Sequence, residues 1–248
     1  MTLISRRAAL TGAAFAGAGC ATLGVEAASC EALYANPLAS EADIRGFRLE
    51  GQARISFPNG RMRMENVLAP EQGQRANHVL WCPESFPDNI RIRWKFWSLR
   101  EPGLAMLFFA ARGQNGAHVL DPSLRPRNGP YEDYIRGDIA ALHVSYFRRR
   151  EPSERAFNVC NLRKTPGFHL VAQGADPLPA PEVATPPYAI EILKQGPRVA
   201  FSINTLPLFE WTDDGTRGPV LRGGSLGFRQ LAPLMAEYAD LEITRADP

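Results

Sequence analysis

The middle third of the chain carries side chains suited to proton transfer and to holding an anion. Histidine titrates near neutrality and tyrosine can exchange a proton with a reacting group, so both are candidates for acid–base chemistry. Arginine and lysine pair with carboxylates, and asparagine and glutamine form paired hydrogen bonds. The group consists of His143, Tyr146, Arg148, Asn161, Arg163, Lys164, His169 and Gln173.

Alternating apolar and polar residues predict that three neighbouring strands, over 139–148, 157–164 and 168–173, position this group. Successive side chains of a strand point to opposite faces, so His143 and Tyr146 cannot share one. In the other two strands, Asn161 can share a face with Arg163, and His169 can share a face with Gln173. Either His143 or Tyr146 is therefore expected to line a cleft together with these residues. The alternative is that the basic groups are solvated edge residues and the histidines are core polar groups.

The remaining sequence predicts a single all-β domain of two packed antiparallel sheets. Glycine and proline each occur 21 times, and no stretch has a useful length of helical periodicity. The apolar run 104–111 is typical of a strand buried on both faces, whereas 122–131 contains three prolines and predicts a loop. In the alternating strand 90–97, Trp94 is on the apolar side and is expected in the core. Further strands are expected over 188–194, 198–204, 208–211, 226–229 and 238–244.

Five further side chains are candidates for the site. A glycosidase needs two carboxyl groups about 5–9.5 Å apart, and Asp138 and Asp176 are the best pair, although each is also typical of a turn. Arg229 and Glu237 are either site residues or a buried ion pair that closes the domain. Trp97 shares a strand face with basic residues and is a candidate for stacking on a ligand.

The charge balance argues against nucleic-acid binding. The 28 basic and 26 acidic residues leave a net charge of +2, whereas nucleic-acid binders gather a basic excess on one face. The arginine run 148–150 stands alone and is predicted to be a solvated loop. No metal-ligand spacing is present, so no metal or other cofactor is expected to be required.

Residues 1–27 are predicted to be an export signal, which leaves 28–248 as one domain. Ser5-Arg6-Arg7 precedes an Ala- and Gly-rich stretch, as in twin-arginine signals, and the stretch is too weakly apolar for a membrane span. The expected location is periplasmic or secreted, with lipid attachment at Cys20 as an alternative. Cys30, Cys82 and Cys160 would remain, as one disulfide and a free thiol or as buried thiols.

Five segments of the sequence resemble the YesU-like family. They begin at His78 (HVLWCPESFPDNI), Glu101 (EPGLAMLFFAA), His143 (HVSYFRRR), Asn161 (NLRKTPGFHLVAQGADPLP) and Gly227 (GFRQLAPLMAEYA). The resemblance covers roughly residues 40 to 245. It implies a concanavalin A-like jelly roll, the sandwich of many lectins, glycoside hydrolases and polysaccharide lyases, and it carries no catalytic assignment.

That fold implies a sugar ligand bound on a concave sheet by aromatic faces and planar polar groups. We therefore predict an enzyme that cleaves glycosidic bonds in plant or algal oligosaccharides or polysaccharides, by lyase or hydrolase chemistry, with β-elimination at a uronate slightly favoured over hydrolysis. A non-catalytic glycan-binding module is the alternative. Such folds often carry a structural calcium, so a calcium ion is possible here. The sequence does not predict an oligomeric state. We expect His143, Tyr146 and His169 to transfer protons, and we expect Arg148, Arg163 and Lys164 to bind the sugar carboxylate.

Overall fold

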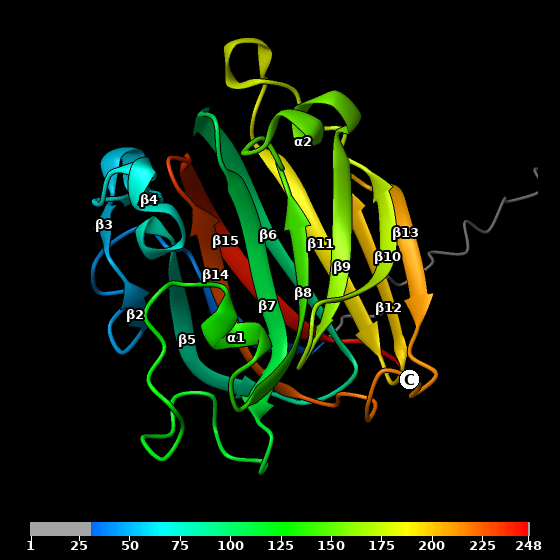
Figure 1. Cartoon of the computed structure of the whole chain (residues 1–248). Coiled ribbons are helices and arrows are strands. Elements are labelled where there is room, and N and C mark those ends of the chain that lie inside the picture. The colour runs from blue at the N-terminus through cyan, green and yellow to red at the C-terminus, as the bar shows by residue number, and fades with distance from the viewer. Residues whose placement is uncertain (1–30, 248) are drawn as a thin grey trace, which may run out of the picture.

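The computed structural model describes residues 31–247, so the predicted signal segment, Cys20 and Cys30 lie outside the described part of the chain. Two antiparallel sheets pack face to face (Figure 1). The eight-stranded sheet has the order β13 (Leu206–Thr212), β12 (Arg198–Ile203), β11 (Tyr188–Gln195), β6 (Ile90–Arg100), β15 (Met235–Arg245), β4 (Met62–Asn66) and β3 (Ala53–Ser56), and β1 (Ala32–Asn36) also pairs with β15. The seven-stranded sheet has the order β10 (His169–Ala175), β9 (Val159–Thr165), β8 (Ile139–Tyr146), β7 (Leu104–Gly113), β14 (Gly224–Leu231), β5 (His78–Phe86) and β2 (Arg48–Gly51). The predicted all-β sandwich is confirmed.

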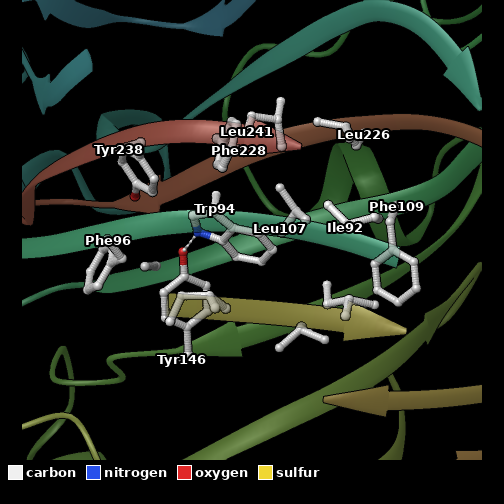
Figure 2. Packing of buried hydrophobic residues seen from close by; sticks show 14 of the residues in the cluster. Ile92, Trp94, Phe96, Leu107, Phe109, Tyr146, Leu226, Phe228, Tyr238 and Leu241 are labelled. Atoms are coloured by element: carbon white, nitrogen blue, oxygen red, sulfur yellow. Dashed lines mark hydrogen bonds between the residues drawn. The ribbon is translucent and has the colours of Figure 1, made fainter. Parts of the chain in front are cut away.

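The core lies between the two sheets and follows the alternation of the sequence. In β6, Ile92, Trp94 and Phe96 point inward and are almost completely buried. Figure 2 shows Trp94 at the centre of this core, where its indole nitrogen donates a hydrogen bond of 3.0 Å to the hydroxyl of Tyr146. A buried aromatic side chain contributes roughly 1.5–3 kcal/mol, and the internal hydrogen bond satisfies the two polar groups that the core contains at this point.

β7 and β8 are buried on both faces, as the apolar run 104–111 predicts. One face packs in the core, and the segment between these two strands folds back over the other. This segment includes the helix α1 (Glu132–Ile135; Figure 1). The ring of Tyr134 stacks on Phe108, with centroids 5.4 Å apart. A second, smaller apolar cluster therefore forms on the outer face of the seven-stranded sheet.

The other helical segments are short. They are α2 (Pro152–Phe157) between β8 and β9, and the 3-10 turns η1 (Pro58–Gly60), η2 (Pro70–Ala76) and η3 (Pro181–Val183). Within residues 31–247, no helix has the length and apolar character needed to cross a bilayer.

Cys82 and Cys160 are free thiols buried in the core. Burial raises the pKa of the Cys82 thiol to about 11 and also raises the pKa of Cys160, so both remain protonated at neutral pH. Cys82 and Cys160 therefore match the prediction of buried thiols, in which cysteine serves as a small apolar core residue.

Candidate functional site

A pocket of about 180 Å³ lies on the outer face of the seven-stranded sheet, over β8 and β9, and we call it the β8–β9 pocket. Residues of β7, β8, β9 and β14 contribute its sheet side, and residues from loops, turns and α2 complete its lining. The lining residues are Gln74, Leu104, Met106, Tyr131, His143, Ser145, Arg148, Glu154, Asn161, Arg163, Phe168 and Leu231.

A larger groove of about 930 Å³ on the eight-stranded sheet is a weaker candidate. All of its basic side chains are paired with carboxylates, so the groove has no unpaired cation to offer an anionic ligand. These ion pairs are Arg93–Glu191 at 2.6 Å, Arg198–Glu210 at 2.6 Å and Lys95–Asp240 at 2.8 Å.

Strand register brings the polar residues of the β8–β9 pocket together. His143 pairs with Arg163 and Ser145 pairs with Asn161 across β8 and β9. Met106 of β7 is the next neighbour of Ser145 in the same row. Directly paired residues share a face and lie about 5 Å apart, so these side chains meet on one surface. Of the two predicted alternatives, His143 and not Tyr146 shares a face with Asn161 and Arg163.

His143 and Tyr131 form a buried hydrogen-bonded pair at one wall. The His143 Nε2 atom lies 2.7 Å from the Tyr131 hydroxyl. Burial, together with the charges of Arg163 and Arg229, lowers the pKa of His143 to about 3, so the imidazole is neutral at physiological pH. Burial also raises the pKa of Tyr131. The wall is therefore an uncharged donor–acceptor pair.

Arg163 supplies positive charge to the pocket and has no carboxylate partner among the described residues. Its guanidinium stacks on the ring of Phe168 at 3.6 Å and donates a hydrogen bond of 3.1 Å to the Phe168 carbonyl. The side chain is partly buried, and this desolvation lowers its pKa, although it stays charged. A stacked, unpaired guanidinium has free N–H donors for an anionic ligand.

A polar row continues from Arg163 along β9 and β10. The amides of Asn161 and Gln173 lie 2.7 Å apart, and with its oxygen turned toward Arg148 the Asn161 amide accepts a bond of 3.1 Å. Arg148 also forms an ion pair of 2.7 Å with Glu154 of α2. Unlike Arg163, Arg148 thus has an internal counter-charge.

Arg229 lies beneath this site rather than in its lining. Its guanidinium is fully buried between the rings of Tyr131 and Tyr134, at 5.2 and 4.9 Å from their centroids. None of its three guanidinium nitrogens has a hydrogen-bond partner among the described residues. The two aromatic faces partly offset the cost of this buried charge, and the charge helps to keep His143 neutral.

Three predicted site residues from the central strands lie elsewhere. Tyr146 points into the core, where its hydroxyl accepts the hydrogen bond from Trp94, because it shares a strand face with Leu142 and Val144. Lys164 is buried on the opposite face from Arg163 and forms an ion pair of 2.7 Å with Asp213. His169 is on the edge strand β10, outside the pocket lining.

The remaining predicted residues also lie outside the β8–β9 pocket. Asp176 is buried in an ion pair of 3.0 Å with Arg149, and Asp138 accepts a backbone hydrogen bond from Arg125. The two carboxylates therefore serve local structure and form no catalytic pair in the pocket. Glu237 is on the eight-stranded sheet, where it pairs with Arg61 and Arg63, and Arg61 also stacks on Trp97 at 4.5 Å. Glu237 and Trp97 thus belong to a structural cluster on the other sheet.

Several lining residues lie outside the predicted group because they come from irregular segments. Tyr131 ends the proline-rich loop, Gln74 belongs to η2, and Phe168 lies in the β9–β10 turn. Periodicity carries no information about such segments. The tyrosines on either side of Glu132 and Asp133 in this loop are the one compositional signal that could have drawn attention to it.

Residues 31–247 contain no group of three or more His, Cys, Asp or Glu side chains placed to hold a metal ion. The polar groups of the β8–β9 pocket are neutral amides, hydroxyls and an imidazole, two cationic guanidinium groups, and the carboxylate of Glu154, which Arg148 neutralises. This set suits an organic anion better than a cation.

Comparison with solved structures identifies proteins of similar architecture. A Bacillus subtilis protein of unknown function with a galectin-like fold superposes with a TM-score of 0.83 and 50% identity, covering 87% of this chain and 96% of that chain. The carbohydrate recognition domain of Emp47p superposes with a TM-score of 0.58 at 15% identity, covering 89% and 99%. The latter likeness concerns the fold alone.

Sequence comparison gives the relationship directly. The uncharacterised protein YesU of Bacillus subtilis (strain 168) is 51% identical over 215 residues, which is 86% of this chain and 96% of YesU. The model of the domain of unknown function DUF1961 matches residues 31–243. YesU is therefore a relative of this chain, and the chain belongs to the DUF1961 family.

Proposed function

We propose that this protein binds an acidic sugar in the β8–β9 pocket. The observation that carries the proposal is Arg163, a cation stacked on Phe168 that has no carboxylate partner among the described residues. A sugar carboxylate would supply the missing charge and two acceptor oxygens to the planar guanidinium.

The rest of the pocket suits the hydroxyls and apolar faces of a sugar ring. Ser145, Asn161 and Gln74 offer both donors and acceptors, and the His143–Tyr131 pair adds further neutral polar atoms. Met106 and the ring of Phe168 offer apolar surface for C–H groups. The combination of one unpaired cation and several neutral groups favours a monoanionic ring over a multiply charged ligand.

The comparisons support a glycan ligand by analogy of fold. One similar structure is the carbohydrate recognition domain of Emp47p, and another, VIP36, was solved with Ca²⁺ and Man3GlcNAc, with a TM-score of 0.54. Fold likeness alone does not transfer a ligand, so the proposal depends on the chemistry of the pocket.

The first test is isothermal titration calorimetry of the protein and its Arg163→Gln variant with galacturonate and glucuronate oligosaccharides. Loss of a charge-assisted bond should weaken binding about tenfold or more. Arg54→Gln is the matched control, because Arg54 is an exposed arginine of the other sheet with only a distant partner, Glu65, at 3.9 Å. Equal affinity of the Arg163→Gln variant and the unchanged protein would refute the proposal.

β-Elimination is a second candidate function, and the hydrogen-bonded His143–Tyr131 pair beside Arg163 is the observation that favours it. With the carboxylate on Arg163, His143 would take the proton from C5, the C4–O bond would break as the C4=C5 bond forms, and Tyr131 would protonate the leaving oxygen. An imidazole with a pKa of about 3 is a poor base at neutral pH, which ranks this function below binding.

Ultraviolet absorbance of unsaturated products, followed in the calorimetric samples after prolonged incubation, separates the two functions. A rise in absorbance that the His143→Gln variant abolishes would establish elimination. Constant absorbance with measurable affinity would establish binding without cleavage of these substrates.

A further inference from the structure

We infer that the site recognises the end of a sugar chain, with the terminal unit in the β8–β9 pocket and the next unit in an adjoining hollow. This inference depends on the proposed acidic-sugar function. The hollow has a volume of about 420 Å³ and lies beside α2, so we call it the α2 hollow. It shares four residues with the pocket, which are Arg148, Glu154, Asn161 and Arg163.

The shared residues form the passage between the two spaces. A ligand that contacts Arg163 in the pocket can continue past Asn161 to Gln173, whose amide lies 2.7 Å from that of Asn161. Arg148 and Glu154, paired at 2.7 Å, flank the same passage. A glycosidic linkage placed here would meet donors and acceptors on both sides.

Contacts between loops close the pocket away from the α2 hollow. The Tyr131 ring packs edge-on against Phe168, with centroids 5.6 Å apart, and its backbone nitrogen donates to the side chain of Gln74 at 3.3 Å. The turn that carries Gln74 is tied by Asn77 to Arg150 at 3.2 Å. These contacts form a wall of the pocket, and the α2 hollow adjoins the pocket through the four shared residues. On this inference a chain enters from the α2 hollow and ends in the pocket.

Two large apolar side chains are exposed to solvent at the α2 hollow. Phe157, the last residue of α2, is 76% exposed, and Leu170 on the other side is 47% exposed. Phe168, which is 55% exposed, lines the pocket but not the α2 hollow. Exposed rings that border a polar cleft are suited to stacking on the C–H face of a sugar, which accounts for the placement of Phe157.

The number of protein molecules bound per sugar chain tests the inference. Calorimetry with uronate chains of three units and of several tens of units, made from whichever uronate binds most tightly, gives this number directly. End recognition predicts one protein per chain at both lengths. A number that rises in proportion to chain length would overturn end recognition while leaving acidic-sugar binding intact, whereas no binding of any uronate would overturn the proposed function itself.

Phe157→Ala tests the second unit separately. The variant should weaken binding of the trimer about fivefold and leave that of the single uronate unchanged. Val183→Ala is the control, because Val183 is similarly exposed, at 71%, and lines neither space. Equal trimer affinities of the Phe157→Ala and Val183→Ala variants would contradict the assignment of the second unit to the α2 hollow.

Discussion

At the scale of single residues, the pocket combines one unpaired cation with polar groups that are kept neutral. Arg163 remains charged because a guanidinium does not lose its proton in proteins. His143 is neutral because it is fully buried near Arg163 and Arg229. Because His143 is neutral, Arg163 is the cation without a carboxylate partner in the pocket lining. Protonation of His143 would add a further positive charge close to both Arg163 and Arg229.

The buried state of His143 predicts a loss of stability in acid. Its pKa is about 3 in the folded protein and about 6.5 in an unfolded chain, so below pH 6.5 the unfolded state takes up a proton that the folded state does not. This residue alone should lower the free energy of unfolding by up to about 1.4 kcal/mol for each pH unit between 6.5 and 3.

Urea unfolding at pH 7 and pH 5 measures this effect, with His143→Gln as the comparison because glutamine can keep a hydrogen bond to Tyr131. The variant should lose less stability between the two pH values than the unchanged protein. Identical losses would mean that His143 does not titrate differently on folding.

At the scale of elements, the site depends on how the ends of β8, β9 and β10 are fastened. Arg149 follows β8 and pairs at 3.0 Å with Asp176, which follows β10, and Arg149 also donates a bond of 2.6 Å to the Leu178 carbonyl. Both side chains are buried. The pair holds the segment that carries Arg148 against the strand that carries Gln173.

Asp176→Asn should therefore destabilise the fold by about 3–5 kcal/mol, because it removes the closest countercharge of the buried guanidinium of Arg149. Glu210→Gln, which breaks an exposed pair with Arg198, should leave the free energy of unfolding nearly unchanged. Chemical unfolding of both variants checks the contrast, and an equally small change in both would show that the Arg149–Asp176 pair does not fasten these strands.

The sequence predicted which strands carry the site more accurately than it predicted which residues line the pocket. Alternation was enough to place Asn161 and Arg163 on one face, but it left open whether His143 or Tyr146 shares that face. The same rule could have assigned Tyr146 to the core, since Leu142 and Val144 share its side of β8. Tyr131 and Phe168 could not be predicted, because their positions depend on how a loop and a turn fold over the sheet.

At the scale of the whole molecule, the sandwich separates stability from recognition. The large core lies between the two sheets. On the outer face of the eight-stranded sheet, charged residues such as Glu237 and Lys95 form ion pairs. The seven-stranded sheet is covered in part by the loop that contains α1 (Figure 1). The β8–β9 pocket lies over the same face, with Tyr131 of this loop in its lining. The seven-stranded sheet therefore presents Arg163, a cation without a carboxylate partner among the described residues, in a pocket that can hold a ligand.

Calorimetric titration of the unchanged protein with a uronate trisaccharide and with its methyl ester tests the central claim most directly, because the ester keeps the shape of the ligand and removes its charge. The account predicts that the acid binds at least about tenfold more tightly than the ester, and that added salt reduces the difference. Equal affinities for the acid and the ester would contradict a site built around Arg163, and an absence of binding for both would contradict the proposal that the β8–β9 pocket holds an acidic sugar.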